Sequence, residues 1–155
     1  MDEVSFKILK ILQEKARIPN VEVSRQVGLA PSAVLERIRK LEKQGIIEGY
    51  EVRLNPKYFT KSLVAFVTVV TAPGKKGDRA GKDLAKIELV QEVHLVAGED
   101  AYLVKLRAAD TQELGQIIRH RIAVIEGVQS TRTVIVLETV KETARIPIGE
   151  KQTGD

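Results

Sequence analysis

The order of strand-like and helix-like segments in residues 62–140 constrains the fold more than any other feature of the sequence. Runs of β-branched and apolar residues predict strands at 62–71, 90–97, 101–109 and 127–140, and helical patterns follow the first and third runs. The order βαββαβ is typical of a ferredoxin-like domain with an antiparallel sheet. Its two helices cover one sheet face, so we expect a second copy of the chain against the other. The apolar candidates for that interface are Val64, Phe66, Val70, Val134 and Val136.

The two helices of this domain are predicted from apolar spacing. Before the first, the glycines and lysines of segment 74–79 predict a flexible, charged loop. The second begins after Asp110, whose carboxylate suits the N-cap position, with Glu113 three residues on as in a capping box. The apolar stripes are Ala80, Leu84 and Ile87 in the first helix and Leu114, Ile117, Ile118 and Ile122 in the second.

Residues 1–47 show the spacing of three further helices. Asp2 is placed to cap the first, which runs to about Ala16, and Asn20 is placed to cap the second. Gly28 ends the second helix in the left-handed conformation that glycine adopts at little cost. A short helix and a glycine turn therefore precede the third helix.

The third helix has two contrasting sides. Pro31 suits its first position, and the helix runs to about Gln44, where Gly45 stops it. At about 100° per residue the apolar residues fall together, and the opposite side is polar with mixed charge. Mixed charge is also the ordinary way to keep a core helix soluble, so periodicity alone leaves that alternative open. The apolar stripe is Val34, Leu35, Ile38 and Leu41, and the opposite side holds Ser32, Ala33, Glu36, Arg39, Lys40 and Lys43.

This arrangement has the layout of a helix-turn-helix motif, whose second helix enters the major groove of DNA. Small side chains at Ser32 and Ala33 would let the backbone approach the bases, and Glu36 can accept a hydrogen bond from cytosine N4. Two lysines further along suit phosphates, and Arg37, which flanks the apolar stripe, either orients the helix or contacts a phosphate. The candidate DNA-binding residues are Ser32, Ala33, Glu36, Arg37, Arg39, Lys40 and Lys43.

Charge favours this hypothesis over its alternatives. The net charge is +4, and residues 1–60 carry 11 Lys and Arg against 8 Asp and Glu. The basic excess therefore lies mostly in the N-terminal third, beside the predicted motif. A metabolite-sensing or assembly module without sequence-specific DNA binding is the alternative, and it leaves this excess unexplained.

The sequence lacks the residues that several other classes of function require. The absence of cysteine excludes disulfides and thiolate metal sites, and His94 and His120 lie in no metal-binding spacing. No catalytic set or phosphate loop is recognisable, which predicts a protein that is not an enzyme and has no cofactor. There is no apolar run of ~18 residues and no signal peptide, which predicts a cytoplasmic protein without a membrane partner.

The sequence resembles the Lrp/AsnC family of leucine-responsive, or feast/famine, transcription regulators over residues 2–140. The segments that carry the resemblance are ILKILQEKAR, GLAPSAVLERIRKLEKQGII, VAGEDAYLVKL and GVQSTRTVIVL. The resemblance implies a transcription regulator that binds double-stranded DNA as a homodimer and assembles further, up to an octamer. It also implies a small-molecule effector, usually an amino acid, bound where dimers meet.

The turn Gly98–Tyr102 corresponds to the loop that lines the effector site in this family. The residues alone favour a simple hairpin turn, and only the resemblance adds a role in effector binding. Ala101 stands where the family usually has Asp, so we expect common amino acids to bind weakly there. The candidate effector-binding residues are Gly98, Glu99, Asp100, Tyr102, Thr131 and Thr133.

Together these features predict an α+β chain in four parts. Residues 1–47 form a winged-helix-like helix-turn-helix domain, and 48–61 form a linker strand that pairs with the partner's copy. Residues 62–140 form the ferredoxin-like domain for effector binding and oligomerisation, and 141–155 form a loose polar tail.

Overall fold

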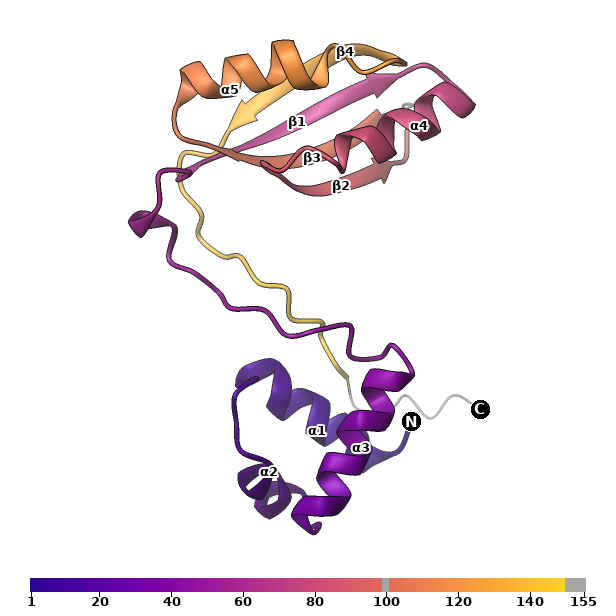
Figure 1. Cartoon of the computed structure of the whole chain (residues 1–155), viewed down its shortest axis with the longest axis vertical. Helices are drawn as coiled ribbons and strands as arrows, with labels where there is room; N and C mark the ends of the chain where they lie inside the picture. Colours follow the sequence, from indigo (N-terminus) through magenta and orange to yellow (C-terminus); the bar gives the residue numbers. More distant parts are fainter. Residues whose placement is uncertain (99–100, 150–155) are drawn as a thin grey trace. The chain divides into compact units, whose positions relative to one another are not determined.

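The computed structural model describes residues 1–98 and 101–149, which divide into two compact units (Figure 1). The N-terminal unit comprises Met1–Arg53 together with the chain that returns from Glu142, and the C-terminal unit comprises Leu54–Lys141. The fold class is α+β, with helices alone in the first unit and one antiparallel sheet with helices in the second. The two units are therefore joined by two segments of the chain.

The N-terminal unit consists of α1 (Glu3–Glu14), α2 (Asn20–Val27) and α3 (Pro31–Lys43). Each helix contributes apolar side chains to one core, because the apolar positions recur at helical spacing. The fully or nearly buried members are Ile8, Val23, Val34 and Ile38, with Val4, Ile11, Leu12, Ile18, Val27, Leu29 and Ile47 packed around them.

The ends of these helices largely follow the predicted caps. The Asp2 side chain accepts a hydrogen bond from Ser5 N and caps α1, and Gly28 ends α2 at φ 71°. The expected cap at Asn20 is wrong, since this residue is already helical and Pro19 holds the cap position in extended conformation. The Pro19 carbonyl accepts from both Glu22 N and Val23 N, so the backbone starts the helix without a side-chain cap.

The C-terminal unit has the predicted βαββαβ order. Its strands are β1 (Leu63–Thr71), β2 (Val90–Val96), β3 (Ala101–Ala108) and β4 (Val128–Ile135), and its helices are α4 (Lys75–Leu84) and α5 (Thr111–Ile117). The strands form one antiparallel sheet in the order β2-β3-β1-β4. A π-helical turn at Ile118–Ile122 continues α5, and a 3₁₀ turn lies at Pro56–Tyr58.

Alternate residues of the central strands build the core of this unit. The side chains of Tyr102, Val104, Leu106 and Ala108 are buried on the helix-covered face, as their period-2 spacing predicts. Lys105 and Arg107 lie on the other, open face, opposite Phe66 and Val64 of β1. Helices α4 and α5 and the π-helical turn complete the core with Leu84, Leu114, Ile117 and Ile122.

Helix α4 begins at Lys75, where we had expected a flexible loop. The glycines that suggested a loop instead allow close packing. A Cβ atom on Gly77 would lie 2.3 Å from the Ala72 carbonyl oxygen, and one on Gly81 would lie 2.4 Å from Cζ of Tyr102. Two glycines four residues apart therefore bring one side of α4 against the sheet.

Within this chain the linker forms no strand, since the described structure has only the 3₁₀ turn between α3 and β1. Pairing of the linker with the partner's copy stays a prediction. The alternating residues from Ile46 to Pro56 are mostly exposed, and the exposed fraction of Val52 is 81%. A strand needs a hydrogen-bonded neighbour, and no strand of this chain pairs with the segment.

The segment after β4, predicted to be a loose tail, contacts the end of α1 at Arg145 and Ile146. Gln13 at the end of α1 forms two hydrogen bonds with the backbone of Ile146: its Nε2 donates to the carbonyl oxygen at 3.1 Å, and its Oε1 accepts from the amide nitrogen at 2.7 Å. Arg145 Nη2 donates to the Glu14 carbonyl oxygen at 3.4 Å. Polar composition predicts a free tail, but here one glutamine side chain pairs with both backbone groups of Ile146.

Candidate nucleic-acid interface and effector region

The turn between α2 and α3 is built from backbone geometry. The Ser24 carbonyl accepts from Gly28 N at 2.9 Å and from Leu29 N at 3.1 Å, which closes α2. Ala30 then adopts an extended conformation at the N-cap of α3, and Pro31 occupies the first helical position. These residues give the helix-turn-helix geometry that the sequence predicts.

One stripe of α3 faces away from the core. Its members are spaced by four, three and four residues, which places them on the same side of the helix, and all of them are exposed. Ala33, half-buried, and Lys40, exposed, border this stripe. The stripe, called here the exposed stripe, consists of Ser32, Glu36, Arg39 and Lys43.

The charged side chains on this side of α3 form no ion pair with the part of the chain that the structure describes. Within residues 1–98 and 101–149, no ion pair involves Glu36, Arg39, Lys40 or Lys43. By contrast, exposed charges on α1 and α2 pair within their own helices, Lys7 with Glu3 and Arg25 with Glu22. The unpaired charges of α3 can bind an external partner without first breaking an ion pair.

The start of α3 is also open to a partner. Ala30 supplies no side-chain cap, and the first turn contains no acidic residue. The first N–H groups of a helix lack intrahelical acceptors and favour anions such as phosphate. Small side chains at Ser32 and Ala33 leave room for an approaching surface, as the sequence suggests.

Arg37 is the one candidate DNA-binding residue that the structure turns inward. Its Nη1 donates to Asp2 Oδ2 at 2.5 Å and to Ser5 Oγ at 3.3 Å. Hydrogen bonds from Ser5 and from Arg37 hold the pKa of the Asp2 carboxyl well below its usual range. Of the two roles considered for Arg37, this geometry favours orienting α3 against the start of α1.

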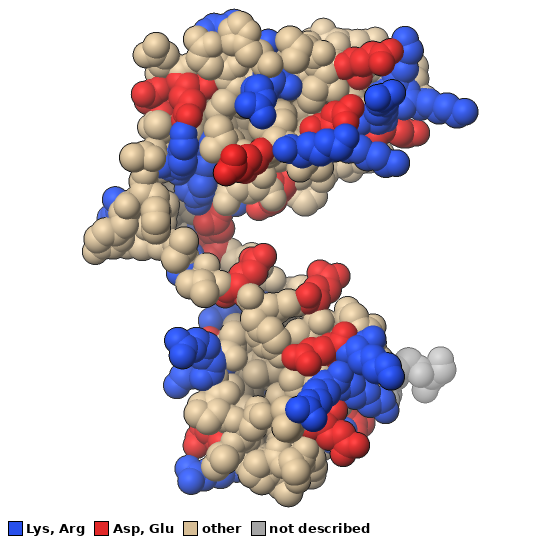
Figure 2. Space-filling model, viewed as in Figure 1, with Lys and Arg blue, Asp and Glu red and all other residues tan. Residues whose placement is uncertain are grey.

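On the face shown in Figure 2, charge alone does not mark a binding surface. Lys and Arg side chains are interspersed with Asp and Glu over the face shown in Figure 2. This agrees with the small net charge of +4. Recognition therefore has to come from the placement of particular side chains.

The candidate effector residues fall into three groups. Gly98 has φ 110°, and Glu99 and Asp100 lie outside the described residues. Tyr102 is only 9% exposed, and its ring packs beneath α4 at Gly81. Thr131 and Thr133 are half-buried on β4.

Strand register places the last two groups side by side. Val69 of β1 lies opposite both Tyr102 and Thr131, so these residues form one row on the helix-covered face. Thr133 lies one step along the same face, opposite Val67. Ala101 starts β3 on the open face, so it points away from this row.

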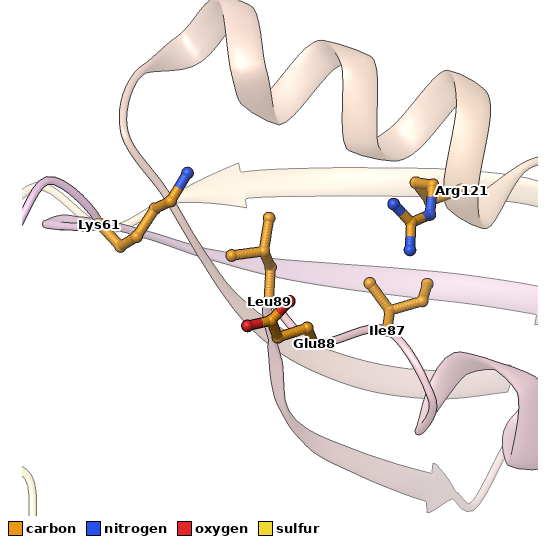
Figure 3. Close-up of a pocket in the computed structure, with 5 residues that line it drawn as sticks. All are labelled: Lys61, Ile87, Glu88, Leu89 and Arg121. Carbon is orange, nitrogen blue, oxygen red and sulfur yellow. The ribbon is translucent and has the colours of Figure 1, made fainter.

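The structure also reveals a pocket that the sequence did not indicate, at the other end of the sheet (Figure 3). It has a volume of about 260 Å³ and brings together side chains from before β1, from the connection between α4 and β2, and from the π-helical turn. Only the contacts of the folded chain unite these positions, so no spacing rule could find them. The lining residues are Lys61, Ile87, Glu88, Leu89 and Arg121.

No metal or membrane feature emerges from the described residues. Within residues 1–98 and 101–149 there is no cluster of three or more His, Cys, Asp or Glu that could hold a metal ion. Over the same part of the chain, no helix is both long and apolar enough to span a membrane. His94 lies on β2, with its Nε2 atom 3.2 Å from Glu92 Oε2. His120 lies on the π-helical turn.

The two units define a class of protein: regulators that join a helix-turn-helix DNA-binding domain to a separate ligand-binding domain. Residues 1–48 match the family model "Winged helix-turn-helix DNA-binding", and residues 64–146 match "Lrp/AsnC ligand binding domain". The chain belongs to the Lrp/AsnC family of transcription regulators.

Known relatives are similar to this chain in sequence and structure over nearly its whole length. The leucine-responsive regulatory protein of Escherichia coli is 39% identical over 150 residues, which cover 96% of this chain and 92% of that protein, and the Klebsiella pneumoniae protein of the same name matches equally well. Among solved structures, a Neisseria meningitidis transcriptional regulator in complex with L-Met has a TM-score of 0.88 at 30% identity, covering 95% of this chain and 96% of that one. Escherichia coli AsnC has a TM-score of 0.84 at 25% identity, with coverage of 94% and 97%.

Proposed function

We propose that the protein binds duplex DNA as a homodimer, with the exposed stripe of α3 in the major groove. The observation that carries this proposal is that Glu36, Arg39, Lys40 and Lys43 have no ion-pair partner among the described residues. Glu36 and Arg39 lie near enough to the helix start to read base edges, and Lys40 and Lys43 suit phosphates. Two copies of α3 then enter successive major grooves about 34 Å apart, or a multiple of that distance.

The open face of the sheet supports a dimer. Phe66 and Val134 lie opposite each other on this face, and Val134 is 59% exposed. Val64 and Val70 share the face, since they alternate with the core residues of β1. No helix covers this face, and its apolar side chains lie beside Lys105 and Arg107, so the apolar part of it is a candidate for burial against a second copy.

We further propose that an amino acid or a related small molecule modulates DNA binding. Support comes from relatives named leucine-responsive and from a similar structure that contains L-Met. A ligand that binds one assembly state more tightly than another shifts DNA occupancy by that difference in affinity. The row of Tyr102, Thr131 and Thr133 and the turn that begins at Gly98 are the family-type candidates for this site.

The experiment that tests this function is selection of duplex DNA from a random library by the purified protein, repeated with each common amino acid. We expect one enriched motif with two related half-sites, and enrichment that at least one amino acid alters. The Glu36→Gln variant supplies a sharper arm: it should enrich a different base at one position, because an amide both donates and accepts where a carboxylate only accepts. An unchanged motif with equal loss of affinity on all sequences would contradict a base-reading role for Glu36.

A further inference from the structure

We propose that the pocket lined by Lys61, Ile87, Glu88, Leu89 and Arg121 binds a small α-amino acid with an aliphatic side chain. The pocket lies where β1 and β2 begin, whereas the turn from Gly98 lies where β2 ends. At about 3.3 Å per residue, the length of β2 puts ~20 Å between the two places. A role of this pocket in regulating DNA binding rests on the proposed function. Binding of an amino acid in the pocket does not depend on that function.

The floor of the pocket is apolar and fixed. Ile87 is only 7% exposed and belongs to the core, and Leu89 packs against that core. The backbone between them is held by hydrogen bonds from Val90 N to the Ile87 carbonyl and from Arg107 N to the Leu89 carbonyl, both of 2.9 Å. A preformed aliphatic floor favours an aliphatic ligand side chain, because binding then buries apolar surface without ordering the protein.

The walls carry one unpaired charge of each sign. Within the part of the chain that the structure describes, neither the Arg121 guanidinium nor the Glu88 carboxylate has an ion-pair partner. An amino acid presents both complementary charges on one carbon atom. Arg121 can take the carboxylate through two parallel hydrogen bonds, and Glu88 can accept from the ammonium group.

Lys61 belongs to the frame of the pocket. Its ammonium group pairs with Glu113, which also accepts from Ala109 N at 2.5 Å and thereby ties the start of α5 to the start of β1. The hydrogen bond from Lys61, and after it the one from Ala109 N, lower the pKa of the Glu113 carboxyl below its ordinary value. Because the charge of Lys61 is already neutralised by Glu113, Arg121 is the cation of the pocket that can bind the carboxylate of a ligand.

The backbone that positions Arg121 is unusual. At the end of α5, Ala123 N bonds to the Ile118 carbonyl at 2.8 Å, five residues back, so the turn is π-helical. Such turns are rare and often occur at functional sites. This turn buries Ile122 in the core and leaves Arg121 exposed, and Figure 3 shows the Arg121 guanidinium pointing toward Ile87.

The size of the pocket limits the ligand. Its 260 Å³ lies just below the ~300–1,000 Å³ of sites for drug-sized ligands. A single amino acid is of suitable size for this volume. Among amino acids, the aliphatic floor and the two opposite charges favour leucine, isoleucine and valine.

The test is an NMR titration of the full-length protein, labelled at isoleucine and leucine methyl groups, with L-leucine and without DNA. We expect saturable shifts at the methyl groups of Ile87 and Leu89. Arg121→Ala and Glu88→Gln should each weaken binding by about tenfold or more. Arg119→Ala removes the same charge from an exposed position on the same turn outside the pocket, so it should bind leucine as the wild type does.

Two ligand analogues test the charge assignment. 4-Methylpentanoate, which is leucine without its amino group, should bind more weakly than leucine to the wild type and be insensitive to Glu88→Gln. If it binds as tightly as leucine, the pocket is a carboxylate site and the assignment to an amino acid is wrong. Leucine shifts that leave Ile87 and Leu89 unmoved would also overturn the proposal. Because no DNA is present, failure of the proposed DNA binding cannot produce either result.

Discussion

Arg37 shows how a single residue on the helix proposed to bind DNA can serve the fold. Its guanidinium contacts Asp2 and Ser5 at the start of α1, so it ties the orientation of α3 to that of α1. Asp2 in turn caps α1. The sequence left two roles open for Arg37, because a position beside an apolar stripe can face either the core or a ligand.

This contact makes the N-terminal unit sensitive to acid. The folded pKa of Asp2 is depressed, so its contribution to stability is present above about pH 4, its unfolded pKa, and is lost as the pH falls through the folded pKa. Asp2→Asn keeps a capping oxygen but cannot titrate or pair with Arg37 as an anion. We expect the wild type to have the higher melting temperature at pH 6, and the difference to shrink steadily toward pH 2. A difference that stays constant over this range would contradict the role of the charge.

Gly81 gives a second prediction at this scale. A methyl group there would collide with the buried ring of Tyr102, so Gly81→Ala should lower the free energy of unfolding by about 1–3 kcal/mol in urea titrations. Gly115→Ala in α5 is the matched control, since its Cβ would meet only the end of the flexible Arg119 side chain at 3.4 Å. Gly115→Ala should leave the free energy of unfolding unchanged or raise it slightly, because alanine favours a helix. Equal effects of the two substitutions would show that Gly81 is not a packing contact.

At the scale of elements, patterns local in sequence were predicted well. The alternation in β3 and the apolar stripes of α3 and α5 determine which faces are buried, and the structure confirms them. Features that depend on distant contacts were missed: the start of α4, the π-helical turn, and the pocket at Arg121. A glycine that allows close helix packing and a glycine that forms a turn look alike in a sequence. The linker between α3 and β1 has no strand of the same chain to pair with.

The segment around Ile146 is the element whose contacts are easiest to remove. Its amide donates to Gln13 Oε1, so Gln13→Ala should speed hydrogen exchange at Ile146 by about two- to tenfold, the worth of one side-chain hydrogen bond. Glu14→Ala leaves intact the carbonyl that accepts from Arg145, so it should leave this amide as protected as in the wild type. Equal exchange in the Gln13 variant and the wild type would show that the segment does not dock on α1 in solution.

For the whole molecule, two chain segments join the DNA-binding unit to the ligand-binding unit. A change in the sheet domain can therefore reach the helices through the linker and through the segment docked on α1. Placing two copies of α3 on one duplex requires a dimer, and in the assembly proposed above the open face of the sheet supplies it.

Val134→Glu tests that dimer. The residue is 59% exposed on the open sheet face, and burying an unpaired carboxylate at an interface is strongly unfavourable. Light scattering coupled to size exclusion should show the mass of a monomer for this variant. Val124→Glu changes an equally exposed valine after the π-helical turn, at 68% exposure, and should keep the wild-type mass. An oligomer that survives Val134→Glu would place the interface elsewhere.

The salt dependence of DNA binding tests most directly whether α3 is the DNA-binding surface. Each phosphate contact adds about 0.9 to the slope of log affinity against log salt concentration, so Lys40→Ala with Lys43→Ala should reduce the wild-type slope by about 2. Lys10→Ala with Lys15→Ala removes two exposed lysines of the α1 region and should leave the slope unchanged. A slope that both double variants share with the wild type would contradict the assignment of α3 to DNA.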